Sequence, residues 1–390
     1  MRRRTYVLYS LVGLFLFCIP FQIQSQETLI ENKKNQPSSL EESFFITPSE
    51  LTLAFSHPEG ARKLSFQTYQ GSAEQWKEEA KKKLTELLKV SDPPSCEVRV
   101  LRTTEHQGVT LHALIMKVYE NLSLPGYLLV PERGKKVESA VIAIHGHGRV
   151  EPCLGLRDDY HHSFALELAK AGHLVICPEL RGFGVLKDLA AGVEINRLDY
   201  WIGGYSQFTL VTDGFLYGNT LIGETVEDLM RWERWFVESQ GIKEFDVAGI
   251  SYGGDLSLIF PVFSDRVRRI FASGTLGSFS AIFQRCYNAP AHCIPGILEW
   301  MDRSDIAGLN APRPIAIHYG ELDTPSPTNA SASYNETVPQ SLQELRNIYK
   351  IFGGEDAVQL IVTPGKHHEM DISELLKFLD DVPKFRWGRA

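Results

Sequence analysis

Apolar residues in this chain recur at two different spacings, and the spacing predicts where helices and strands lie. Between positions 72 and 90 they return every three or four residues, at Trp76, Ala80, Leu84 and Leu87. That period predicts an amphipathic helix with one covered face. Ser72 and Gln75 have the spacing of a capping box at its start.

From Cys96 onward, short apolar runs bounded by turn residues predict strands. VRVLRT, VTLHALIMKVY and LPGYLLVPE come first and are expected to pair antiparallel. Six further apolar runs follow: ESAVIAIHGHG, HLVICPEL, EFDVAGI, RRIFASG, RPIAIHYG and AVQLIVTPG. Helical stretches such as HSFALELAKAG, ETVEDLMRWERWFVESQG and DISELLKFLDDV lie among them. This alternation predicts an α/β fold, a mostly parallel twisted sheet with helices on both faces, after an N-terminal helical lead-in.

Composition narrows the class of protein. Of the 390 residues, 43% are hydrophobic and 23% charged, as in ordinary globular enzymes. The formal net charge of -8 argues against nucleic acid as a partner, because surfaces that bind phosphate backbones are strongly basic.

The N-terminus has the pattern of an export signal. Three arginines precede an uncharged apolar run from Tyr6 to Phe21, and the small residue Ser25 follows. We therefore expect a signal peptide over 1–25, an extension over 26–95 and a catalytic domain over 96–390, in a secreted or periplasmic protein. No stable membrane anchor is expected after cleavage, and the alternative is that the apolar run is kept as an anchor. Cys286 and Cys293 are then the most plausible disulfide pair, although five cysteines in the mature chain leave the pairing open.

The stretch GISYGG, residues 249–254, surrounds Ser251 with glycines between an apolar strand and a helix. A strand that turns into a helix this tightly needs neighbours without bulk, and it lifts the serine hydroxyl above the sheet. That arrangement is a nucleophile elbow. The alternative, a glycine-rich turn without chemistry, does not explain the placement between strand and helix.

A serine hydroxyl needs a base to take its proton, and in this architecture an acid and then a histidine follow the serine along the chain. GELDTPSP follows a later strand and offers Asp323, with Glu321 as the alternative. GKHHEM follows the last strand and offers His368, with His367 as the alternative. The expected triad is Ser251, Asp323 and His368.

Two backbone amides are expected to stabilise the oxyanion. One is that of Tyr252, directly after the nucleophile, and the other that of His147 in the loop HGHGR after an early strand. His145 and His147 could instead be metal ligands, but no carboxylate or cysteine accompanies them at ligand spacing. No metal and no cofactor is expected. DDYHH, residues 158–162, is interpreted as the polar start of a helix.

These motifs, in this order, resemble the α/β-hydrolase superfamily, in particular its acetyl xylan esterase and dienelactone-hydrolase-like branch. The resemblance spans roughly residues 96–382 and rests on HGHGR, PELRGFG, GISYGG, CIPGILEW, GELDTPSP and GKHHEMD. It implies the same triad and the same oxyanion amides. Arg181 resembles a loop residue that braces the site. Lys366 and His367 depart from the small residues usual before the histidine, which keeps the choice of histidine open.

The expected function is that of a secreted serine esterase, which cleaves short acyl groups such as acetate from a carbohydrate or another small alcohol through an acyl-enzyme. One alternative is a serine peptidase of the prolyl-oligopeptidase type, although the chain before His145 is too short for a propeller. A binding protein without catalysis is the other alternative. The segments LDYWIGGYSQFTLVTDGFLYG and RCYNAPAHCIPGILEW are expected to be loops that shape the pocket.

Overall fold

A computed structural model describes residues 62–132, 137, 139–184, 186, 206–279, 290–323 and 336–381. All of them belong to one compact unit, Thr52–Ala390. The predicted signal peptide and Cys286 lie outside the described residues, so the export signal, the disulfide and the domain boundaries stay predictions. Among the described helices, none is long and apolar enough to cross a membrane.

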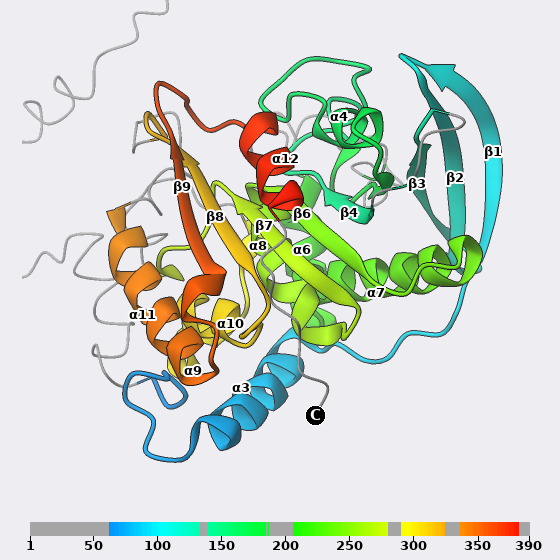
Figure 1. The fold of residues 1–390 in the computed structure, drawn as a ribbon. Coiled ribbons are helices and arrows are strands. Elements are labelled where there is room, and N and C mark those ends of the chain that lie inside the picture. The colour runs from blue at the N-terminus through cyan, green and yellow to red at the C-terminus, as the bar shows by residue number, and fades with distance from the viewer. Residues whose placement is uncertain are drawn as a thin grey trace, which may run out of the picture. The chain divides into compact units, whose positions relative to one another are not determined.

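Within the described residues, nine strands form a single sheet in the order β1-β2-β3-β5-β4-β6-β7-β8-β9 (Figure 1). The strands are β1 (Glu97–His106), β2 (Val109–Tyr119), β3 (Leu122–Val130), β4 (Ala140–Ile144), β5 (Leu174–Pro178), β6 (Phe245–Ile250), β7 (Val267–Ser273), β8 (Ile315–Gly320) and β9 (Val358–Thr363). The pairs β1–β2, β2–β3 and β3–β5 are antiparallel. The pairs from β5–β4 through β8–β9 are parallel. The prediction of three antiparallel strands followed by a parallel sheet is confirmed.

Helices cover both faces of the sheet (Figure 1). Their bounds are α3 (Ala73–Leu88), α4 (Phe164–Lys170), α6 (Ser206–Tyr217), α7 (Leu221–Gln240), α8 (Tyr252–Ile259), α9 (Ile297–Trp300), α10 (Arg303–Gly308), α11 (Val338–Ile351) and α12 (Ile372–Asp380). Buried side chains of α3, α7, α8, α10 and α11 belong to one hydrophobic cluster. Those of α4 and α12 belong to a second cluster. The two clusters therefore lie on opposite faces of the sheet, as expected for an α/β-hydrolase fold.

The central strands divide their side chains between these clusters. In β4, Ile142 and Ile144 join the first cluster while Val141 and Ala143 join the second. All five residues of this strand are buried. A strand with both faces covered has no polar side, which explains the continuous apolar runs in the sequence. Because β4 and β6 are central and parallel, the loops after their carboxyl ends meet at one rim of the sheet.

One residue of the buried face of α3 and one predicted loop differ from the expectation. The capping box is present, with Ser72 and Gln75 bonding each other's backbone. However, Leu88 is fully buried at the end of α3, while Leu87 is only partly buried. The segment expected to be a loop around residue 210 contains α6, a helix from Ser206 to Tyr217. Its weak amphipathic pattern, with several apolar residues in succession, hid the helix.

Candidate active site

Ser251 lies in a strained turn at the carboxyl end of β6. The strand ends at Ile250 and α8 begins at Tyr252, so one residue connects them. Its backbone has φ 59° and ψ -121°, a region that side-chain-bearing residues rarely adopt. The amide of Ser251 donates to the carbonyl of Ser273, at 2.9 Å, which ties the turn to the end of β7. This geometry is that of a nucleophile elbow.

The turn also requires glycine after the serine. A Cβ placed on Gly253 would lie 2.1 Å from the carbonyl oxygen of Ile144, at the end of β4. A side chain is therefore excluded there, and α8 can begin directly above the sheet. Tyr252 is the first residue of α8, where an amide has no acceptor within the helix. Its N–H is available to a developing negative charge near Ser251.

Asp323 and His368 are in contact at the same rim. Nδ1 of His368 lies 2.8 Å from Oδ2 of Asp323, whose side chain is 2% exposed. A carboxylate accepts the Nδ1 proton, so Nε2 carries the lone pair. Within the described part of the chain, Nε2 of His368 is buried and has no hydrogen-bond partner. The imidazole is thus oriented as a proton acceptor.

The alternative residues point elsewhere. His367 is exposed, and so is Glu321, which accepts the amide of Gly365 at 2.8 Å. The loops after β8 and β9 are held together by the amide of Leu322, which donates to the carbonyl of Lys366 at 2.7 Å. This bond brings the acid and the base of neighbouring strands together.

Gly274, after the end of β7, lies between the serine and the histidine in the order of the strands. It has φ +61°, and a Cβ on it would lie 2.5 Å from Cε1 of His368. The imidazole can therefore extend from the β9 loop across the end of β7 only because this residue has no side chain.

Gly274→Ala is expected to lower kcat/KM for an activated ester about 10- to 100-fold, because the methyl group displaces the imidazole. Gly241→Ala is the matched control, since Gly241 has φ +65° and open space around it. Both variants should lose about 1 kcal/mol of stability from the left-handed backbone. Equal activities in the two variants, measured per folded molecule, would contradict this packing.

Tyr160 lies beside both the serine and the histidine. Its hydroxyl donates to the carbonyl of His147 at 2.7 Å, and its ring centroid lies 5.6 Å from that of His368. A Cβ on Gly146 would lie 2.3 Å from this hydroxyl and 3.0 Å from Cβ of Ser251, so both side chains flank Gly146. Within the described residues Nε2 of His368 has no hydrogen-bond partner, so its bond to Ser251 is not formed in this structure. Catalytic hydrogen bonds in ligand-free sites are often made only when substrate binds.

Two buried neutral histidines hold the loop after β4. Nδ1 of His145 donates to the carbonyl of Gly146 at 2.7 Å, while its Nε2 accepts the amide of Leu180 at 3.0 Å. His161 accepts the amide of Gly146 at 2.8 Å and donates through Nδ1 to Asp159 at 2.7 Å. Each ring uses both nitrogens on the protein, which favours a structural role over metal binding. In the described ranges, no group of three or more metal-ligating side chains is found.

Because it needs a neutral His145, the fold should weaken in acid. Burial lowers the pKa of His145 to about 3. An unfolded histidine has a pKa of about 6.5, so between these values the unfolded chain binds a proton that the folded chain does not. The free energy of unfolding should then fall by about 1.4 kcal/mol per pH unit as the pH drops through this window. By urea unfolding, the loss of unfolding free energy between pH 7 and pH 5 should be about 2 kcal/mol smaller in His145→Gln than in the parent, because about 1.5 of these two pH units lie in the window. Equal losses would refute it.

Sequence reasoning missed Tyr160 and His161. DDYHH has the pattern of a polar helix start, and α4 does begin just after it, at Phe164. One tyrosine and two histidines within five residues could have indicated a site, but the backbone groups that the side chains of Tyr160 and His161 bond lie elsewhere in the sequence. Arg181 ties its loop to α7, since its Nε donates to Asp228 at 2.6 Å, and its role in bracing the site stays a prediction.

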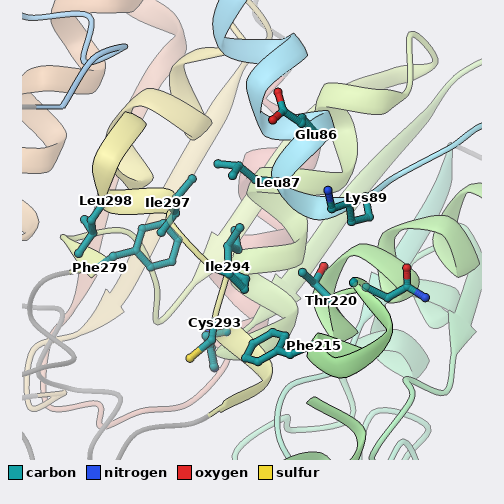
Figure 2. Close-up of a pocket in the computed structure, with 14 residues that line it drawn as sticks. Glu86, Leu87, Lys89, Phe215, Thr220, Phe279, Cys293, Ile294, Ile297 and Leu298 are labelled. Atoms are coloured by element: carbon teal, nitrogen blue, oxygen red, sulfur yellow. The ribbon is translucent and has the colours of Figure 1, made fainter. Parts of the chain in front are cut away.

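A cavity of about 530 Å³ lies between the end of α3, the segment from α6 to α7 and the segment around α9 (Figure 2). Its lining is mainly apolar and includes Leu87, Phe215, Phe279, Ile294, Ile297 and Leu298. Glu86 and Lys89 are exposed residues of the lining, from the end of α3. His292 also lines this cavity, and its ring stacks on that of His147 in the loop after β4.

Several solved structures of esterases are similar to this chain. An acetyl xylan esterase, as it is described, from Bacteroides fragilis matches with a TM-score of 0.61 and 18% identity, over 83% of this chain and 84% of that one. A methylesterase matches with a TM-score of 0.60 and 16% identity, over 85% of this chain and 66% of that one. A glucuronoyl esterase from Solibacter usitatus matches with a TM-score of 0.58 and 11% identity, over 84% and 99%. Neither a family model nor a curated protein sequence matches the chain. At these identities the likeness establishes the α/β-hydrolase fold.

Proposed function

We propose that this protein is a serine esterase that hydrolyses acetyl-type esters of carbohydrates through an acyl-enzyme. The observation that carries the proposal is the bond of 2.8 Å between His368 and the buried Asp323, on the rim where Ser251 occupies a strained turn. A histidine held in this tautomer is oriented to take a proton, and the serine directly before α8 is the group on this rim that can give one.

In the proposed reaction, the hydroxyl of Ser251 bonds to Nε2 of His368 and attacks the ester carbonyl. His368 takes the hydroxyl proton and gives it to the leaving alcohol, while Asp323 stabilises the imidazolium. Water then attacks the acyl-enzyme by the same route and releases the acid. The amides of Tyr252 and His147 donate to the oxyanion in both steps, each worth about 3 kcal/mol of barrier.

The structural neighbours support a carbohydrate ester as substrate, because the proteins compared above include an acetyl xylan esterase and a glucuronoyl esterase. They differ in which side of the ester carries the sugar. In an acetyl ester the sugar is the leaving alcohol, whereas in a uronate ester it is the acyl group. We propose that this protein acts on acetyl esters, in which the sugar is the leaving alcohol.

A substrate panel tests this choice. Purified protein without residues 1–25 would be assayed with acetylated xylo-oligosaccharides, methyl glucuronate, p-nitrophenyl acetate and a dipeptide p-nitroanilide. We expect acetate release from the sugar with a kcat/KM at least about 10-fold above that for the uronate. Preference for the uronate would redirect the assignment, and amide cleavage at rates rivalling ester cleavage would favour a peptidase.

We also propose that residues 1–25 direct export, on the strength of the arginines and the uncharged apolar run from Tyr6 to Phe21. N-terminal sequencing of protein recovered outside the cytoplasm should begin after Ser25. An N-terminus that retains the apolar run would indicate an anchor instead.

A further inference from the structure

A buried charge cluster lies one helical turn beyond Ser251, and the proposed reaction does not use it. Asp255 is in the first turn of α8, its amide donates to the carbonyl of Ser251 at 3.1 Å, and it is 3% exposed. Arg303 binds both of its oxygens, through Nε at 3.1 Å and Nη2 at 3.0 Å. Thr275 donates to the same carboxylate.

This cluster keeps its charge. Burial raises the pKa of Asp255, but Arg303 and His292 outweigh it, so the net effect is to lower the pKa below its usual range. A buried ion pair adds little net stability compared with an apolar pair of the same size, because both charges lose their water. What such a pair does supply is a fixed geometry for the groups bonded to it.

The group fixed here is His292, whose Nδ1 donates to Asp255. Its ring stacks on that of His147, with centroids 5.2 Å apart and planes at 21°. It also meets the ring of Tyr252 edge-on, with centroids 5.1 Å apart and planes at 70°. His147 and Tyr252 are the two residues whose amides are assigned to the oxyanion, so one ring contacts both.

The cavity of Figure 2 explains why this contact needs a hydrogen bond. His292 is one of the residues that line that cavity, although only 3% of it is exposed, so the cavity leaves room beside an otherwise buried residue. The bond to Asp255 and the stack on His147 supply the restraint that packing does not give there. Loss of either would let the ring move toward the cavity, and the side chains of His147 and Tyr252 would lose a shared neighbour.

We infer that His292, held by Asp255 and Arg303, is a positioning residue that keeps the two oxyanion-binding amides at the right separation. This inference rests on the proposed esterase function. His292 does not touch the substrate or move a proton in this account. Loss of the His292 ring should therefore weaken the stabilisation of the transition state and leave binding of the substrate nearly unchanged.

Two variants separate the two restraints on the ring. His292→Phe keeps a ring for the stack and removes the hydrogen bond, while His292→Asn keeps a donor near the Nδ1 position and removes the stack. For each we expect kcat for p-nitrophenyl acetate to fall about 10- to 100-fold with KM changed less than about threefold. Arg303→Lys keeps the charge but loses the paired geometry, and should give a smaller loss in kcat.

The readout must exclude simple loss of folding. Rates would be divided by the concentration of sites titrated with a fluorophosphonate, so unfolded molecules do not count. Phenylboronic acid would be the second probe, because its adduct with Ser251 places a negatively charged oxygen in the oxyanion site. Its Ki should rise by about the same factor as kcat/KM falls. His112→Phe is the matched control, since His112 also bonds through Nδ1, to Thr103 on β1, far from the site in sequence.

Three outcomes would overturn the inference. One is an unchanged kcat per titrated site in both His292 variants, with only the number of titrated sites reduced. Another is an unchanged Ki for phenylboronic acid. The third is wild-type protein that neither hydrolyses esters nor reacts with the fluorophosphonate, which would also remove the proposed function. An active wild type with unaffected His292 variants would remove the positioning role alone.

Discussion

Ser251→Ala should abolish ester hydrolysis, with kcat/KM for p-nitrophenyl acetate at least about 10⁴-fold below that of the parent. Ser251 alone occupies the strained turn between β6 and α8. No acyl-enzyme can form without its hydroxyl. Alanine is smaller than serine by one oxygen, and the neighbouring glycines that permit the turn are unchanged, so the fold should stay intact. Steady-state rates and circular dichroism would be measured on the same sample.

Ser257→Ala is the matched control, because Ser257 lies on the same helix. Its side chain is also buried, and its hydroxyl donates to the carbonyl of Gly253 at 2.7 Å. We expect this variant to lose about 1 kcal/mol of stability and less than about threefold in rate. A Ser251→Ala enzyme that retains more than a few per cent of parental turnover would show that another group performs the attack.

Asp323→Asn should be the second largest effect, a loss of about 10⁴-fold in kcat. The carboxylate accepts the Nδ1 proton of His368 at 2.8 Å and leaves Nε2 as the acceptor. An amide that turns its NH₂ group toward Nδ1 would instead stabilise the opposite tautomer, with the proton on Nε2. The amide also carries no charge to stabilise the imidazolium. Substrate binding should be nearly unchanged, so the effect belongs in kcat rather than KM.

Glu321→Gln tests the other candidate acid. Glu321 is exposed and bonds the amide of Gly365, so neutralising it should change kcat less than about threefold. If Glu321→Gln were the more damaging of the two variants, the assignment of the acid would be wrong. A comparable pair, His368→Gln and His367→Gln, would decide the base in the same way.

Sequence patterns predicted most of the fold because the central strands are buried on both faces. Runs such as VIAI in β4 and VAGI at the end of β6 have no polar residue and are buried throughout, which is typical of parallel strands covered on both faces. The strand pattern also predicted where the candidate residues lie, since Ser251, Asp323 and His368 each come after the end of a strand. It did not predict which side chains touch. The bond to Asp323, which only the structure shows, distinguishes His368 from His367.

What the sequence could not predict depends on contacts between distant segments. Tyr160 and His161 lie before α4, and nothing near them in the chain indicates that they bond the backbone of His147 and Gly146. His292 lies in RCYNAPAHCIPGILEW, a segment whose sequence predicts a loop, and it stacks on His147, which lies 145 positions earlier. Such partners follow from the packing of the loops at the rim, which hydrophobic periodicity does not describe.

Labelling with a fluorophosphonate tests the central claim most directly. Ser251 would lose its proton to His368 and bond to phosphorus as fluoride leaves, so each protein molecule would gain one phosphonyl group. We predict a single modified peptide, which contains GISYGG with the adduct on Ser251, and loss of ester hydrolysis in proportion to labelling. Adduct on a different residue, or full hydrolytic activity in protein labelled at Ser251, would contradict the account.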